Sequence, residues 1–401
     1  MEGKKKWGLL VYGTVMLLFL GLIYAWSIFR APFNEIYTAW TPTQLSMTFT
    51  ISIICFCLGG FISGKIISVL KPKIVILISA VLLFVGFFVV SGMNQKDESG
   101  SLAVLYVFYG VFGGCGVGIT YNAVLSSVTK WFPGKTGLAS GILLFGFGLG
   151  GMILGTVVNG LIADAGIFTT FFYLAVIIAI VLVIGAFVIK MPPAAKGSSD
   201  GREVKNYTLG EMLKTPSFWV FFIWELIICS AGLLVINSAA NIAVAFGAAA
   251  TLGLIVSVFN GGGRIVIGTL FDKKGRKISM TANTVIMVLA GIFLFVGALT
   301  GNMIFIFIGL PLVGISYGGT PSLTSAITNK FYGPKHYPVN LSIVNFALIP
   351  AALIGPLISS MLQESSGGAY NTTFIMLIVL AAVALLFNGL TTAFAKKENL
   401  D

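Results

Sequence analysis

Two ionisable residues, Arg264 and Glu225, lie inside long apolar stretches of this 401-residue sequence. A charge at the centre of a membrane-spanning helix costs about 2.5–3.5 kcal/mol, so such a residue usually faces a cavity or a partner. The planar guanidinium of arginine matches a carboxylate through two hydrogen bonds. We therefore expect Arg264 to bind a carboxylate. The alternatives are a permanent ion pair and packing against backbone carbonyls.

Other polar side chains could orient such a ligand. Asn260 precedes Arg264 by four residues, which places both on one face of a helix. Three tyrosines fall in the middle of apolar runs, where a phenol needs a partner. They are Tyr24, Tyr121 and Tyr317. We expect these four side chains to contact the ligand, although packing with an incidental hydrogen bond is an equal alternative for each tyrosine.

Glu225 is the second charge inside an apolar run. At 1.5 Å per helical residue, Glu225 and Arg264 both lie roughly 12 Å from the same end of their runs. Whether they face each other is open. Because the protonation of a buried carboxyl responds to a nearby cation, Glu225 is a candidate for coupling proton movement to anion movement. A structural pair or a neutral, hydrogen-bonded carboxyl is the alternative.

The elements that carry these residues are membrane helices. Hydrophobic residues make up 57% of the chain and charged residues 9%, whereas soluble domains carry about 25% charged residues. Apolar runs of about 20 residues are long enough to cross a bilayer as a helix. Such runs occur at 8–30, 44–66, 73–93, 101–129, 137–162, 168–190, 217–240, 251–271, 278–300, 302–329, 337–362 and 371–394. The sequence therefore predicts an all-α membrane protein with twelve transmembrane helices in the lipid bilayer.

The basic residues predict the orientation of these helices. Most of the 24 lysines and arginines fall in loops on one side of the membrane, and cytoplasmic loops carry the excess of such residues. Both termini are then cytoplasmic, and the protein lies in the inner (cytoplasmic) membrane. The net charge of +11 is thus a topology signal, and we expect no nucleic-acid partner.

A polar interruption at 191–216 divides the chain into residues 1–190 and 217–401. Each part holds six of the predicted spans. Two such bundles joined by a cytoplasmic linker are typical of secondary transporters, whose substrate site lies near the midplane between repeats. We expect two six-helix bundles around a central cavity.

The sequence offers no set of side chains for catalysis or for a cofactor. The one histidine, His336, lies in a loop, and the four cysteines lie within apolar runs. Cys55 and Cys57 have the wrong spacing for a zinc pair. We therefore expect no enzymatic activity, no metal and no cofactor.

A loop motif gives a family resemblance. Residues 268–277 read GTLFDKKGRK, which resembles the G-x-x-x-D-[KR]-x-G-R-[KR] loop signature of the major facilitator superfamily. The resemblance implies a cytoplasmic gate at Asp272, Lys273 and Arg276, with Asp272 pairing with basic groups. The alternative is that these charges only set the topology. A degenerate first copy begins at Gly60, with Gly64 at the acidic position.

Further motifs narrow the resemblance. The stretches YAWS at 24–27, GVGITY at 116–121, KWFP at 130–133, GLASG at 137–141, NGGGR at 260–264 and GP at 355–356 are similar to those of the oxalate/formate antiporter and monocarboxylate transporter group. The resemblance implies that Arg264 is the anion anchor and that the three tyrosines line the cavity.

Three departures from that group bear on the substrate and on proton coupling. Oxalate-exchanging members carry a second cation where this chain has Val344, flanked by Asn345, and a tyrosine where it has Phe147. One cation suits one carboxylate, so we expect a monocarboxylate such as lactate, pyruvate or formate. Animal-type carriers have a proton-coupling aspartate where this chain has Asn260, which cannot carry a proton.

These expectations combine into a monomeric secondary active transporter of a small monocarboxylate anion, coupled to H⁺ and working by alternating access. An oxalate–formate-type anion exchanger is the first alternative. A non-transporting carboxylate sensor and a membrane-embedded enzyme rank below it.

Overall fold

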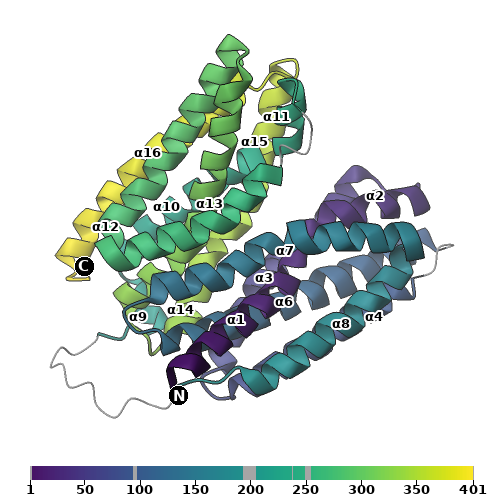
Figure 1. The fold of residues 1–401 in the computed structure, drawn as a ribbon, viewed down its shortest axis with the longest axis horizontal. Helices are drawn as coiled ribbons and strands as arrows, with labels where there is room; N and C mark the ends of the chain where they lie inside the picture. The colour runs from purple at the N-terminus through teal and green to yellow at the C-terminus, as the bar shows by residue number, and fades with distance from the viewer. Residues whose placement is uncertain (1, 94–96, 193–204, 237, 249–253, 401) are drawn as a thin grey trace. The chain divides into compact units, whose positions relative to one another are not determined.

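The computed structural model describes residues 2–93, 97–192, 205–236, 238–248 and 254–400, and every regular element in these ranges is a helix (Figure 1). Residues 193–204 of the expected linker at 191–216 lie outside the described residues. The contacts between residues divide the chain into two compact units. The first comprises Met1–Phe132 and Leu149–Arg202, and the second comprises Pro133–Gly148 and Glu203–Asp401.

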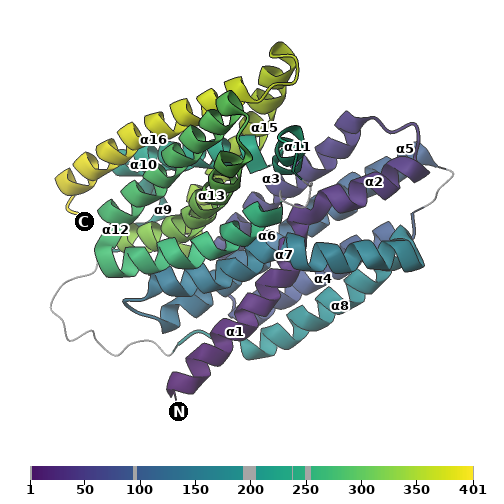
Figure 2. The same ribbon diagram turned by 45° about the horizontal axis from the view of Figure 1, so that its top comes forward.

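The first unit is built mainly from long apolar helices, with two irregular segments inside its spans and a 3₁₀ turn, η3 (Thr129–Trp131), at the end of one span. Its helices are α1 (Glu2–Leu20), α2 (Trp26–Ile36), α3 (Pro42–Ile66), α4 (Pro72–Ser91), α5 (Glu98–Val104), α6 (Gly114–Val128), the C-terminal part of α7 (Thr136–Ala165) and α8 (Ile167–Val188). A 3₁₀ segment, η1 (Gly21–Ala25), joins α1 to α2, and a π-helix, η2 (Leu105–Gly113), joins α5 to α6. Helices α4 and α8 run side by side (Figure 2).

The second unit begins with the N-terminal part of α7 and continues after the linker. Its other elements are α9 (Leu209–Leu213), α10 (Pro216–Ile236), α11 (Ala239–Ala245), α12 (Leu254–Thr300), α13 (Met303–Tyr332), α14 (Tyr337–Val344), η5 (Asn345–Ala347), α15 (Leu348–Ser365) and α16 (Asn371–Lys397). Its apolar core lies among α10, α12, α13 and α16, with Trp224 and Phe221 fully buried. Helix α12 contacts both α13 and α16 (Figure 1).

The helices are long and apolar enough to account for twelve membrane crossings. The described residues contain 11 helices of sufficient length and hydropathy. One of these, Ile255–Thr300, bends at Gly275, whose φ of 76° and ψ of 178° are not helical. Glycine tolerates this positive φ because it has no Cβ. The bend divides α12 into two crossings, so the expected twelve-helix, all-α architecture is confirmed.

Glycines bring one pair of helices close together in the first unit and the corresponding pair in the second unit. In the first unit, a Cβ added to Gly118 of α6 would collide with the carbonyl oxygen of Phe56 on α3. In the second, a Cβ added to Gly318 of α13 would collide with the carbonyl oxygen of Asn260 on α12. The same correspondence links Gly114 to Gly314 and Gly59 to Gly263. One type of close helix crossing is therefore built twice, as small residues in membrane helices allow.

This repeated crossing corrects the alignment of the loop motif. When the correspondence is continued past the end of α3 at Ile66, it matches Ser68, and not Gly64, with Asp272. The prediction that Gly64 takes the acidic position was wrong by one helical turn. The motif begins with a glycine, and both Gly60 and Gly64 could take that position because they are four residues apart. The sequence alone does not decide between these two alignments, whereas the helix crossing does.

We predict that Gly318→Ala lowers the melting temperature of the purified protein. The added methyl must push apart two backbones, and overpacking of this kind costs about 1–3 kcal/mol. Gly389→Ala on α16 is the matched control, because a Cβ there meets nothing within 4 Å. Thermal unfolding in detergent measures both variants, and equal melting temperatures for the two would contradict the crossing.

Candidate functional site

Arg264 lies buried on α12, with 3% of its surface exposed. Its Nε donates a hydrogen bond to Asn260 Oδ1 at 3.2 Å, one turn earlier on the same helix face. Its Nη1 donates to the Leu144 carbonyl oxygen of α7 at 2.8 Å. Arg264 therefore packs against a backbone carbonyl in this structure, which was one of the alternatives to ligand binding. The same geometry holds its planar group in a defined orientation.

Glycines of α7 make room for this arginine. A Cβ on Gly141 would collide with the carbonyl oxygen of Arg264. A Cβ on Gly148 would lie 2.8 Å from Arg264 Nε and 2.9 Å from its Cζ, which is closer than real side chains approach. Small residues such as these allow membrane helices to approach closely. The sequence carried no signal that the Leu144 carbonyl would accept a bond from Arg264, because a carbonyl group is present at every residue.

Asn260 and Tyr317 join Arg264 in the second unit. The crossing of α12 and α13 places Gly318, the residue after Tyr317, against the Asn260 backbone. The buried Tyr317 ring packs over Gly232 of α10, where an added Cβ would lie 2.9 Å from Tyr317 Cγ. Three of the five expected ligand-binding residues thus lie on the two helices of this crossing.

The other two expected ligand contacts belong to the first unit. Tyr24 lies in η1 with 38% of its surface exposed, and its Cβ lies 3.6 Å from the place of a Cβ on Gly151. Tyr121 is buried on α6, where its ring meets that of Phe56 edge-on at 5.1 Å. Their contact with a ligand stays a prediction.

Glu225 is almost fully buried on α10, beside Thr324 of α13. Its Oε2 has no hydrogen-bond partner among the described residues, and neither does Thr324 Oγ1. Within the described part of the chain, Glu225 makes no hydrogen bond or ion pair with Arg264. A buried carboxyl without a counter-ion is costly to keep charged.

The three expected gate residues differ in environment. Asp272 is half-buried, and its two carboxylate oxygens accept hydrogen bonds from the backbone N–H groups of Gly137 at 2.9 Å and Leu138 at 2.7 Å. Lys273 is exposed. Arg276 is buried, with Nη1 3.3 Å from Thr392 Oγ1 of α16. Asp272 was expected to pair with basic groups, and the charge of Lys135 does act on it. Its hydrogen bonds come from the first turn of α7, where the helix dipole favours an anion.

These contacts form one seam between α7 and α12. Along α7 it runs through Gly137, Gly141, Leu144 and Gly148, and along α12 through Asp272, Gly268 and Arg264. The residues of each helix are three or four apart, so each set lies on a single face. The seam therefore connects the expected gate to the expected anion anchor.

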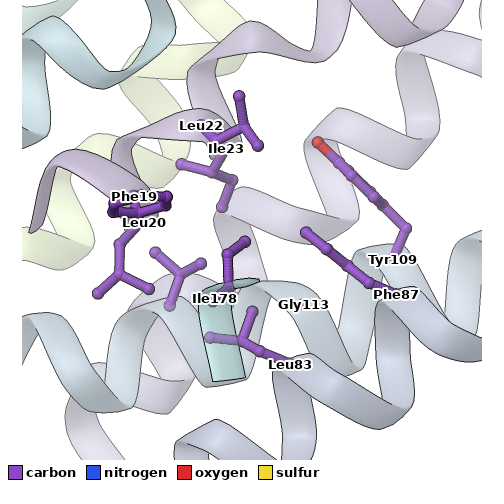
Figure 3. Close-up of a pocket in the computed structure, with 10 residues that line it drawn as sticks. Phe19, Leu20, Leu22, Ile23, Leu83, Phe87, Tyr109, Gly113 and Ile178 are labelled. Atoms are coloured by element: carbon purple, nitrogen blue, oxygen red, sulfur yellow. The ribbon is translucent and has the colours of Figure 1, made fainter. Parts of the chain in front are cut away.

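The first unit contains an apolar recess at its two irregular segments (Figure 3). Leu22 and Ile23 line it from η1, Tyr109 and Gly113 line it from η2, and Ile178 lines it from α8. Its lining includes no charged side chain, so it is unsuited to a carboxylate. Among the described residues, no three His, Cys, Asp or Glu side chains lie close enough to hold a metal ion.

We predict that Asp272→Ala destabilises the seam more than Lys273→Ala. The aspartate satisfies two N–H groups at a helix N-terminus, where such a charge contributes up to about 2 kcal/mol. Lys273 is exposed and serves as the control. The melting temperatures of both variants in detergent test this, and an Asp272→Ala protein as stable as the control would count against the contact.

Comparison with known proteins identifies the family. The model of the Major Facilitator Superfamily matches residues 8–348. The uncharacterized MFS-type transporter YhjX of Escherichia coli K12 is 28% identical over 348 residues, covering 85% of this chain and 84% of the relative. The oxalate:formate antiporter of Oxalobacter formigenes is 28% identical over 393 residues, covering 94% of this chain and 90% of the relative.

Solved structures share the fold at low sequence identity. The proton:xylose symporter XylE matches with a TM-score of 0.77 and 15% identity, covering 96% of both chains. The fucose:proton symporter FucP of E. coli matches with a TM-score of 0.70 and 13% identity, covering 95% of this chain and 98% of that one. Together with the family match over most of its length, these likenesses show that the chain is a multi-pass membrane protein belonging to the Major Facilitator Superfamily of transporters.

Proposed function

We propose that this transporter carries a small monocarboxylate of the lactate, pyruvate or formate type by alternating access, coupled to protons. The observation that carries the proposal is the buried guanidinium of Arg264, held beside Asn260 on a membrane helix. Such a cation is costly in the bilayer unless it serves a ligand or a partner. The binding of a carboxylate compensates this charge, and we infer that compensation favours closure around the substrate.

Neighbouring polar groups would orient the anion. Asn260 stands in hydrogen-bonding contact with Arg264, and Tyr317 lies on the adjoining helix α13. We infer that these two position the carboxylate, and that Tyr24 and Tyr121 contribute their phenols from the first unit.

The charge balance favours a monoanion. Val344, which stands where oxalate exchangers are expected to carry a second cation, is fully buried in the apolar core of the second unit. One guanidinium balances one carboxylate, whereas a dianion would leave a charge uncompensated in low dielectric. The 28% identity to an oxalate:formate antiporter supports anion exchange as the second candidate function.

Glu225 is the proposed proton carrier. Asn260 cannot titrate, and Glu225 is an acid buried on α10 without an arginine partner among the described residues. A charged carboxyl is costly at this buried position. We infer that Glu225 releases its proton when the transport cycle exposes it to water and takes one up before it is buried again.

Orientation and motion complete the proposal. The basic loops indicate that both termini are cytoplasmic, in the inner membrane. We infer that the halves at 1–190 and 217–401 rock as a monomer, with Asp272, Lys273 and Arg276 at the cytoplasmic gate.

We predict that Arg264→Ala abolishes carboxylate uptake while the protein stays folded, because no guanidinium remains to bind the anion. Arg264→Lys should retain only part of the uptake, since an ammonium group lacks the planar pair of N–H donors of a guanidinium. Counterflow in proteoliposomes with lactate, pyruvate, formate and oxalate measures the effect, with circular dichroism as the folding check. Normal counterflow of every acid by Arg264→Ala would refute the proposal.

We predict that Glu225→Gln removes the stimulation of uptake by an outside-acid pH gradient but leaves counterflow intact. Glutamine keeps the shape of the protonated acid and cannot release a proton. Uptake at two external pH values measures the difference. An unchanged proton dependence would eliminate Glu225 as the carrier.

The wild-type protein distinguishes the alternatives in the same vesicles. An anion exchanger shows trans-stimulation with no response to the proton gradient. A sensor binds the carboxylate but gives no flux.

A further inference from the structure

The glycines of α7 differ in what they meet. Gly137 and Gly141 lie against backbone atoms of α12, as close helix packing requires. A Cβ on Gly160 meets nothing within 4 Å. A Cβ on Gly148 would instead crowd a side chain, the guanidinium of Arg264. Helix approach therefore explains the first two glycines and not Gly148.

Gly148 lies against the face of the guanidinium. An added Cβ would lie 2.8 Å from Arg264 Nε, 2.9 Å from Cζ and 3.1 Å from Nη2. A point at the edge of the plane would be distinctly nearer to the nitrogens than to the carbon, so these similar distances indicate the face. The in-plane N–H groups then stay directed at hydrogen-bond acceptors, and two of these acceptors are Asn260 Oδ1 and the Leu144 carbonyl oxygen.

One turn of α7 supplies both supports. In an α-helix the carbonyl of residue 144 accepts a bond from the N–H of residue 148, and α7 is helical throughout this turn. A carbonyl oxygen has two lone pairs, so Leu144 can accept from Arg264 as well. Gly148 thus contributes its N–H to the helical bond and its bare Cα to the guanidinium face.

We propose that Gly148 and the Leu144 carbonyl are positioning groups for Arg264, and that the Leu144 carbonyl occupies the place of the substrate carboxylate. This rests on the proposed role of Arg264 as the anion anchor. Without substrate, the carbonyl satisfies a donor that would be costly to leave bare. A carboxylate displaces it because its negative charge attracts the guanidinium more strongly than a neutral carbonyl does, and because its two oxygens can accept two parallel N–H bonds.

The exchange has a consequence for α7. When a carboxylate takes the Nη1 donor, α12 loses its hydrogen bond to Leu144 at the end of the seam that Asp272 holds at the other end. Substrate binding thereby weakens one end of the α7–α12 seam. The turn of α7 that orients Arg264 therefore also loses a contact when a carboxylate binds.

Gly148→Ala tests the positioning role through transport. The methyl must displace the guanidinium, which weakens its hydrogen bonds to the bound carboxylate. We expect the half-saturating carboxylate concentration in proteoliposomes to rise by about 10-fold, as the loss of one hydrogen bond to a charged group would produce, with the maximal rate per folded protein retained. Gly160→Ala adds the same methyl to the same helix in open space and should change neither value.

A stability cycle tests the contact independently of transport. In the native background, Gly148→Ala should lower the melting temperature because the methyl crowds Arg264. In the Arg264→Ala background it should not, since the space is vacant and alanine favours the helical conformation over glycine. Equal losses in both backgrounds would assign Gly148 to helix packing and overturn the proposal.

The two proposals fail differently. Carboxylate counterflow that survives Arg264→Ala would remove the anion anchor itself. Loss of counterflow in Arg264→Ala together with an unchanged half-saturating concentration in Gly148→Ala would retain the anchor and reject Gly148 as its positioning residue.

Discussion

The hydrogen bonds from the Arg264 guanidinium to Asn260 and to the Leu144 carbonyl hold a cation inside an apolar membrane helix. A charge in that environment tolerates few arrangements, because each donor left without a partner costs free energy. The surrounding structure follows from this constraint. A Cβ at residue 148 would displace the guanidinium, and α7 must approach α12 closely enough for the Leu144 carbonyl to reach Nη1.

The close helix crossing that supports this arrangement is not itself special to the site. The pair α3–α6 crosses at glycines in the same register as α12–α13. At the position of Arg264, the first unit has Gly60. The scaffold is therefore shared by both repeats, and the cation is a local addition to one of them. This agrees with the general rule that function lies in residues placed on a fold and not in the fold itself.

Much of the architecture could be predicted from the sequence because hydropathy acts within each helix. The spans, the break between crossings near Gly275 and the shared face of Asn260 and Arg264 all depend on local periodicity. Other predictions needed contacts between distant segments. Asp272 was expected to pair with basic groups, and the sequence did not indicate that its carboxylate accepts hydrogen bonds from the backbone N–H groups of Gly137 and Leu138. The Glu225–Arg264 contact, which depth alone allowed, is absent among the described residues.

By itself, the sequence determined that this is a membrane protein of many helices, with one arginine and one glutamate inside its spans. Both conclusions follow from composition and from positions along single helices. The tertiary structure decided which groups meet: the Leu144 carbonyl with Arg264, Gly148 with the guanidinium face, and Asp272 with the first turn of α7. The physical reason is that the rotation and crossing of two helices depend on packing between residues more than a hundred positions apart. No local pattern encodes that relation.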